Sequence, residues 1–212
     1  SIPSVVHEVK RLSSEGVREF NLIAQDSSFY GRDLNDGTTL ARLLKELVKI
    51  DNVKWIRLFY LYPTYFDDEL LEIITKEEKI CKYVDIPLQH ISDSVLRRMH
   101  RRDSSQSIKK LLKKLRNTTP YITIRTTLMV GFPGETEADF KELLTFIKAV
   151  KFDNMGAFTY SAQDGTPAAR MVDQVTEEIK ENRYHELMAA QAEISEENNR
   201  NLIGVDTEVL VE

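Results

Sequence analysis

The sequence is poor in cysteine and contains no long apolar run. Cys81 is the single cysteine among 212 residues, which rules out an intramolecular disulfide and fits a reducing compartment. No stretch reaches the roughly 18 consecutive apolar residues that a membrane-spanning helix requires, and no signal peptide is recognisable. We therefore expect a cytoplasmic protein that does not cross a membrane.

The sequence also lacks a strong excess of charge of either sign. Charged residues make up 30% of the chain, and the formal net charge is -5. Such a balance does not mark the whole surface as a nucleic-acid binder. Basic residues do gather locally in RRMHRRD (97–103) and KKLLKKLR (109–116), and the second pattern is typical of a solvated helix face.

Several well-known catalytic signatures are missing. The HExxH motif, the Walker glycine loop and GxSxG do not occur. The four histidines are too scattered along the chain to suggest a metal site. Asp26, Asp93 and Asp164 could serve as acids or bases, but their spacing does not pair them. The residues alone therefore leave the reaction class open.

What the sequence does contain is a regular alternation of strand-like and helix-like segments. Strands are predicted at 18–25, 54–61, 82–88, 121–130 and 155–160. Helices are predicted at 2–15, 38–50, 67–75, 92–99, 104–117, 136–150 and 175–200. This order predicts an α/β fold with a parallel sheet and right-handed crossovers, built either as a barrel or as an open wound sheet.

One detail of the order favours an incomplete barrel. The chain starts with a helix, whereas a helix in this scheme should follow a strand, so we expect a first strand before Ser1. The outer edge of strand 18–25 would then be unpaired and prone to self-association. Helix 175–200 is expected to cover the opposite edge, at strand 155–160, with its apolar residues.

The last residues suggest a domain boundary. VDTEVLVE (205–212) alternates as the opening strand of a separate domain would. We therefore predict a barrel domain over residues 1–200 and the start of a second domain over 201–212.

Each predicted strand ends in polar or glycine-rich residues. The segments at the ends of the five strands are QDSS (25–28), YLYP (60–63), PLQH (87–90), GFPG (131–134) and YSAQDGT (160–166). In parallel α/β folds, ligands bind beyond the carboxyl ends of the strands. Polar residues gather wherever a strand leaves a core, but five such ends together predict one shared ligand site.

The turn after the fourth strand has its own signature. Gly131 and Gly134 permit a positive φ or the close approach of a ligand, and Pro133 stiffens the loop between them. Thr136 and Asp139 are spaced as a capping box for the next helix. Any strand-to-helix connection needs such features, so the turn alone leaves open whether it binds a ligand.

Several segments in a fixed order carry a resemblance to a known family. They are IAQDSSFYG (23–31), RLFYLYP (57–63), YVDIPLQHISDSVLRRMHRR (83–102), RTTLMVGFPGETEADF (125–140) and FTYSAQDGTPAARM (158–171). In this combination the chain resembles the radical S-adenosylmethionine (SAM) methylthiotransferases. The AQDSSFYG and PLQHISD segments look like the branch that acts on a ribosomal protein, the RimO branch, and less like the tRNA branch.

The resemblance implies an open, partial (β/α) TIM-type barrel of the radical SAM class that binds SAM. It also implies two [4Fe-4S] clusters in the full-length enzyme, one of them on a CxxxCxxC loop after the first strand, and a carboxy-terminal TRAM domain. This chain contains no CxxxCxxC. The cluster ligands are therefore expected outside these residues, and no metal ligand is predicted within them.

The reaction implied by the resemblance adds a methylthio group to the β-carbon of an aspartate in the twelfth protein of the small ribosomal subunit. In this family a reduced cluster passes an electron to the sulfonium of SAM, and the resulting radical takes hydrogen from an unactivated carbon. Two alternatives remain. One is a tRNA adenosine methylthiotransferase of the same family, and the other is a cluster-free barrel with a binding or hydrolytic function.

The resemblance also implies residues that contact SAM, although no catalytic residue is assigned. By the general layout of the family, the expected contacts are Gln25 and Asp26 with the methionine amino group, Gln89 and His90 with ribose, Arg125 with the methionine carboxylate, and Gly131 and Phe132 with adenine.

Overall fold

The computed structural model describes residues 1–119 and 121–211, and its elements follow the predicted order. The strands are β1 (Glu19–Leu22), β2 (Trp55–Leu58), β3 (Tyr83–Asp85), β4 (Thr123–Val130) and β5 (Asn154–Thr159). The helices are α1 (Ile2–Ser14), α2 (Leu40–Leu47), α3 (Asp68–Lys76), α4 (Asp93–Arg98), α5 (Ser105–Thr118), α6 (Glu137–Val150) and α7 (Glu177–Arg200). Short 3-10 helices are η1 (Ser27–Phe29), η2 (Pro63–Tyr65) and η3 (Ala168–Arg170).

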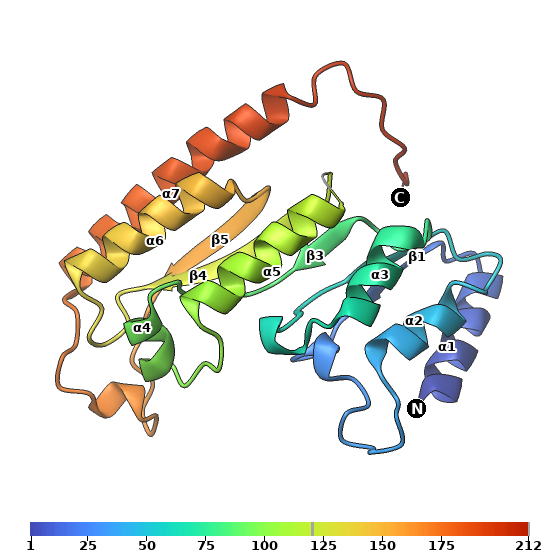
Figure 1. The fold of residues 1–212 in the computed structure, drawn as a ribbon, viewed down its shortest axis with the longest axis horizontal. Coiled ribbons are helices and arrows are strands. Elements are labelled where there is room, and N and C mark those ends of the chain that lie inside the picture. The colour runs from blue at the N-terminus through green and yellow to red at the C-terminus, as the bar shows by residue number, and fades with distance from the viewer. Residues whose placement is uncertain (120, 212) are drawn as a thin grey trace.

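The strands are parallel and form an open arrangement (Figure 1). β1 pairs with β2, and β4 lies between β3 and β5. The two groups meet through single links, such as the hydrogen bond from the Leu61 N–H to the Asp85 carbonyl at 2.8 Å. The described strands do not close into a barrel. The predicted parallel α/β fold with an open, partial barrel is therefore confirmed.

β4 shows how the sequence gives the sheet two different faces. Its side chains alternate between buried and partly exposed along the whole strand. Ile124 and Leu128 belong to the core, which they share with α5 and α6. Arg125, Thr127 and Met129 lie on the opposite face, which we call the open face.

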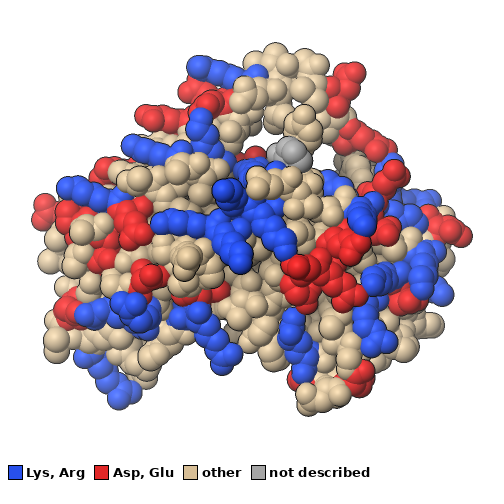
Figure 2. All heavy atoms as spheres, viewed as in Figure 1, with Lys and Arg blue, Asp and Glu red and all other residues tan. Residues whose placement is uncertain are grey.

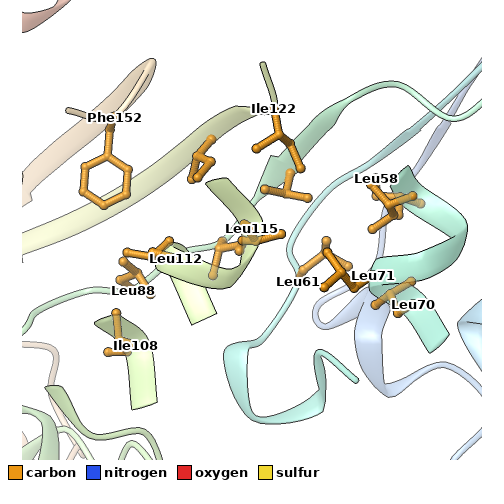
Figure 3. Packing of buried hydrophobic residues seen from close by; sticks show 14 of the residues in the cluster. Leu58, Leu61, Leu70, Leu71, Leu88, Ile108, Leu112, Leu115, Ile122 and Phe152 are labelled. Atoms are coloured by element: carbon orange, nitrogen blue, oxygen red, sulfur yellow. The ribbon is translucent and has the colours of Figure 1, made fainter. Parts of the chain in front are cut away.

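The core lies between the sheet and the helices in front of it (Figures 1 and 3). α5 inserts Ile108, Leu112 and Leu115 toward the sheet, and α3 packs Leu70 and Leu71 near the end of β2. Each fully buried leucine or isoleucine stabilises the fold by roughly 1.5–3 kcal/mol. This packing fixes the positions at which the strands end.

The outer faces of α3 and α5 carry opposite charge. Figure 2 shows basic residues gathered over α5 and acidic residues beside them over α3. The α5 lysines of KKLLKKLR are exposed, as the sequence predicts. Lys114 pairs with Asp68 across the two helices, and Lys45 of α2 lies 2.7 Å from Glu69.

α7 covers the β5 side of the sheet and packs against α6 (Figure 1). Leu187 and Ile194 are buried, which confirms the expected cover, whereas Ile179 stays 42% exposed. α7 is 24 residues long but highly charged. None of the helices in the described ranges combines the length and the hydropathy that crossing a membrane requires.

The carboxy-terminal segment differs from its expected strand. Residues 205–211 form neither a helix nor a strand, and Glu212 lies outside the described residues. A strand needs a neighbour for its backbone hydrogen bonds, and no such neighbour is paired with this segment in the described part of the chain. Glu208 instead lies 2.7 Å from the ammonium of Lys54. The boundary between residues 200 and 201 remains a prediction.

Candidate functional site

A cavity of about 490 Å³ lies where the carboxyl ends of β1 to β4 meet. Its volume is in the range of small-molecule sites. It is lined by Gln25, Asp26, Tyr60, Leu61, Tyr62, Pro87, Gln89, Arg101 and Thr127. The shared site at the strand ends that the sequence predicts therefore corresponds to a real concavity.

Hydrogen bonds between two loops hold the wall formed by the ends of β1 and β2. Asp26 caps η1 by accepting the Ser28 N–H at 3.0 Å. The Ser27 N–H donates to the Tyr60 carbonyl at 2.9 Å, and the Tyr62 N–H donates to the Ser28 hydroxyl oxygen at 2.9 Å. The Asp26 carboxylate is thus held in a fixed position at the cavity.

Two residues of the cavity wall adopt a strained backbone. Tyr60 has φ 54° and Gln89 has φ 67°, values that favour glycine. Such strain costs on the order of 1–3 kcal/mol per residue and concentrates at functional sites. Gln89 is fixed on both sides, because its N–H donates to Thr127 O at 2.9 Å and its carbonyl accepts from the Met129 N–H at 2.7 Å.

The Gln89 side chain still has unused hydrogen-bonding capacity. Its Oε1 is buried and has no hydrogen-bond partner among the described residues. A buried amide oxygen without a partner is unfavourable unless a ligand supplies a donor.

Arg101 supplies positive charge at the cavity. Its guanidinium lies 4.4 Å from the ring centre of Tyr62 and donates to the Pro87 carbonyl at 2.9 Å. Asp103, its nearest carboxylate, is 3.6 Å away, and the buried Nε has no partner within the described ranges. Only 13% of the side chain is exposed. A largely desolvated guanidinium with a free donor is a site for an anionic group.

A second cavity of about 290 Å³ adjoins the first, since Gln89 and Arg101 line both. Its remaining lining is mostly apolar and includes Met99, Met129, Phe132, Pro167, Ala168 and Met171. The rings of Phe132 and Tyr160 meet edge to face, with centres 5.1 Å apart. Flat apolar groups fit such a lining.

The backbone conformation and the packing of the 131–134 turn explain why both of its glycines are glycine. Gly131 has φ 74°, and a Cβ there would lie 2.3 Å from Lys180 Cγ. Gly134 has φ 82°, and a Cβ there would lie 2.4 Å from the guanidinium carbon of Arg98. Both positions need the positive φ that the sequence predicts, and both are packed against long side chains.

Glu135 holds this turn from inside the protein. Its Oε2 accepts the Gly131 N–H at 2.7 Å, and its Oε1 lies 2.9 Å from Arg183 Nη1. Burial raises the pKa of Glu135, and Arg183 opposes that effect. His90 Nε2 lies 3.7 Å from the same carboxylate.

His90 is a buried, neutral residue. Its Nδ1 accepts the Ser92 N–H at 3.0 Å, so the proton of the neutral ring is assigned to Nε2. Burial lowers the pKa of His90 to about 4. The side chain is fully buried and lines neither cavity.

The predicted contact residues therefore separate into two groups. Gln25, Asp26 and Gln89 line the first cavity, and Phe132 lines the second. His90, Arg125 and Gly131 line neither. The ribose contact of His90 stays a prediction; its side chain is fully buried and follows Gln89, whose φ is 67°. Arg125 lies deeper along β4, and Gly131 faces Lys180.

Sequence reasoning missed Arg101 and the methionines of the second cavity, whereas Tyr60 was among the strand-end residues expected at a shared site. Arg101 lies in RRMHRRD, a segment that sequence reasoning noted as a cluster of charge and as part of the family resemblance, without assigning it to the site. His100 before it has φ 55°, so the chain turns at that point. No periodicity signals such a turn.

The described residues do not fit an iron-sulfur cluster. Residues 1–119 and 121–211 contain no group of three or more histidine, cysteine, aspartate or glutamate side chains that could hold a metal ion. Cys81 is half-buried, and burial raises the pKa of its thiol. A four-iron cluster is held by several cysteine thiolates, so this chain supplies no such set.

Curated relatives match the whole chain. It is 51% identical over 211 residues to the ribosomal protein uS12 methylthiotransferase RimO of Pelobacter propionicus, and the match covers 100% of this chain and 47% of that protein. The protein of the same name from Geotalea uraniireducens is 49% identical with the same coverage. The chain thus spans about half the length of the curated relatives it matches.

Solved structures share the fold. Coproporphyrinogen III oxidase (HemN) from Escherichia coli, described as a radical SAM enzyme, superposes with a TM-score of 0.67 at 15% identity, over 91% of this chain and 46% of that one. The radical SAM methyltransferase TsrM from Kitasatospora setae gives 0.62 at 17% identity, over 80% and 33%. The family model of the radical SAM superfamily matches residues 1–147. The chain belongs to the radical SAM superfamily.

Proposed function

We propose that this chain is the SAM-binding core of a methylthiotransferase that modifies an aspartate β-carbon in ribosomal protein uS12. Two observations support the proposal. Relatives about half identical over the whole chain carry that name. The first cavity also offers charged and polar groups and the second offers mostly apolar ones, which suits the two ends of SAM.

The observation that carries the cofactor assignment is that Asp26 and Arg101 both line the first cavity. The methionyl end of SAM has an ammonium and a carboxylate on one carbon, so it needs an anion and a cation close together. Asp26 suits the ammonium, with Gln25 beside it, and Arg101 suits the carboxylate.

The nucleoside end of SAM fits the other cavity. Gln89 lines both cavities, and its unpartnered Oε1 can accept a hydrogen bond from a ribose hydroxyl. Phe132, Met129 and Met171 offer the apolar contacts that an adenine ring needs. Gly131 takes part indirectly, because its N–H bond to Glu135 fixes the backbone before Phe132.

The role of these residues is to hold and shield SAM. Bound SAM supplies an organic radical when a reduced cluster lies next to its sulfonium, and we assign the clusters to residues outside this chain. The chain contributes fixed contacts and an apolar wall that excludes water. We also propose that residues 1–200 form the barrel domain and 201–212 lead into a TRAM-like domain.

The proposal is tested with the full-length, cluster-loaded enzyme. Arg101→Met should weaken SAM binding about 10- to 100-fold in calorimetric titration, because it removes a charge-assisted contact to the carboxylate. The neighbour Arg102→Met, whose side chain is exposed, should leave the affinity unchanged.

The reaction itself is tested by mass spectrometry of uS12 and of tRNA incubated with enzyme and SAM. A methylthio group on uS12 supports the proposal. Modified adenosine in tRNA with unmodified uS12 would assign the chain to the tRNA branch instead.

A further inference from the structure

The aspartate substrate of the proposed function needs a cation in the site that is separate from the groups that bind SAM. The reacting β-carbon of an aspartate is one bond from its carboxylate. Burying that carboxylate beside SAM is strongly unfavourable unless a cation receives it. A guanidinium binds a carboxylate best, through two parallel hydrogen bonds. The cation should lie on the open face, next to the cavities but outside them.

Arg125 occupies such a position. β4 alternates, so Arg125, Thr127 and Met129 follow one another on the open face. Thr127 lines the first cavity and Met129 lines the second. Arg125 is thus one pleat before the cavity wall, roughly 7 Å along the strand from Thr127.

The guanidinium of Arg125 is oriented but still accessible. Its Nη1 lies 3.1 Å from Oδ2 of Asp85, which is its register partner on β3. The Asp85 side chain is fully buried, whereas 37% of the Arg125 side chain is exposed. A guanidinium has five N–H donors in a fixed plane, so one ion pair at its inner side leaves donors for a second carboxylate. Asp85 therefore orients the guanidinium of Arg125 and leaves some of its N–H donors available.

The other arginines near the site are already engaged. Arg101 lines both cavities, where it suits the carboxylate of SAM. Arg57 shares the open face, but its Nε donates to Glu19 at 2.8 Å and its guanidinium stacks on Tyr83 with 5.1 Å to the ring centre. Arg125 lines neither cavity and so lies outside the proposed SAM site.

We infer that Arg125 binds the side-chain carboxylate of the target aspartate and so determines the specificity of the enzyme for aspartate, with Asp85 as its positioning residue. This inference rests on the proposed function and names a recognition residue for it. It gives Arg125 a role different from the cofactor contact that the family resemblance implies.

The test uses the full-length, cluster-loaded enzyme and uS12 with either aspartate or asparagine at the target position. Wild-type enzyme should bind and modify the aspartate form much better than the asparagine form. Arg125→Met should reduce binding of the aspartate form, measured by fluorescence anisotropy with SAM present, and its modification about 10- to 100-fold. The preference for aspartate should collapse, while SAM affinity stays within about twofold. Arg125→Lys should retain part of the preference.

Two further variants make the outcome interpretable. Arg125→Met leaves the buried Asp85 unpaired, so Asp85→Asn with Arg125→Met restores neutrality and should show the same loss of preference in a folded protein. Arg116→Met is the control, because Arg116 is a partly exposed arginine that pairs with Asp153 at 2.8 Å near the opposite ends of the strands. It should keep the preference.

Two results would overturn the inference alone: an unchanged preference in the double variant, or a loss of SAM affinity equal to the loss of substrate binding. If wild-type enzyme binds SAM but modifies neither form of uS12, the proposed function fails and the inference fails with it.

Discussion

At residue 89 the backbone enters the left-handed region, and this decides which of two adjacent polar side chains reaches the cavity. Gln89 lines both cavities, while His90 is buried against Glu135. The sequence places both residues at a strand end, but it does not show the φ of 67° at Gln89. Orientation at this scale depends on single dihedral angles.

The burial of His90 leads to a prediction about pH. Burial lowers its pKa to about 4 from the ordinary 6.5, with Asp139 opposing the shift and Arg183 adding to it. The unfolded chain therefore binds more protons between these values, so stability should fall as pH falls from about 6.5 to about 4 and should not depend on His90 above that window. The expected loss is roughly 3 kcal/mol.

Urea unfolding of the wild type and His90→Asn at several pH values measures this effect. The asparagine oxygen can still accept the Ser92 N–H, so the variant serves as its own structural control. As pH falls below 6.5, the free energy of unfolding should decrease less for the variant than for the wild type. A stability difference that is the same at pH 4.5 and pH 7.5 would show that His90 is not held neutral.

A second prediction at this scale concerns Gly131. Gly131→Ala should lower the free energy of unfolding by about 2 kcal/mol or more, because it adds both a strained φ and a 2.3 Å contact with Lys180. Gly156→Ala is the control, since its Cβ meets nothing within 4 Å. Lys180→Ala in the Gly131→Ala background should remove the steric clash and so regain part of the lost stability, but the backbone strain should remain. Equal stability of the two alanine variants in urea would contradict this account.

At the scale of elements, the β4–turn–α6 unit was the most predictable part of the chain. The strand period, the two glycines and the Thr136–Asp139 capping box all appear as the sequence predicts. β1, β2 and β3 are shorter than predicted, because their last residues leave the sheet and form the loops of the site. A sequence pattern shows where an apolar run ends. It does not show where the hydrogen bonds to the neighbouring strand end.

Arg101 and Arg125 show what the pattern could not supply. The sequence shows both as basic residues, yet their distance from the cavities depends on how α4 and β4 pack. Arg101 reaches both cavities from the loop after α4, whereas Arg125 lies earlier along β4 and pairs with Asp85. Contacts between elements far apart in the sequence leave no periodic signal within either element.

Asp139 joins two elements, and its removal should cost more than the loss of a cap. Its Oδ2 accepts the N–H of Thr136, the N-cap of α6, and its Oδ1 accepts the hydroxyl of Ser94, at the start of α4, at 2.7 Å. Burial disfavours its charge, but hydrogen bonds from Ser92, Thr136 and Ser94 outweigh burial and lower the pKa of Asp139. Its contribution should be complete above the unfolded pKa near 3.8 and be lost as pH falls further.

We predict that Asp139→Ala destabilises the protein by about 2–3 kcal/mol and Thr136→Ala by about 1 kcal/mol at neutral pH. The double variant should lose less than the sum, because both side chains share one network. Denaturant unfolding of the four proteins gives the coupling. Strict additivity would mean that Asp139 does not act through the cap.

At the scale of the whole molecule, the described residues combine the proposed SAM cavity with a single cysteine and no group of side chains that could hold a metal ion. The chain spans about half the length of the curated relatives it matches. Under the proposed function, the clusters are assigned to residues outside this chain.

This assignment predicts that the 212-residue polypeptide binds no [4Fe-4S] cluster. After anaerobic reconstitution with iron and sulfide and removal of excess reagents, it should be colourless and free of tightly bound iron. Iron analysis and ultraviolet–visible spectroscopy measure this, with the full-length enzyme as the positive control. A brown polypeptide with four irons per chain, sensitive to Cys81→Ser, would contradict the assignment.

The central claim is that Asp26 and Arg101 hold SAM for the modification of an aspartate in uS12. Its most direct test is the mass of uS12 from a strain lacking the full-length enzyme, complemented with the wild type or with Arg101→Met at equal protein levels. The wild type should restore one methylthio group at the aspartate, and Arg101→Met should restore little or none. A uS12 that stays unmodified with the wild type, or is modified equally well with Arg101→Met, would contradict it.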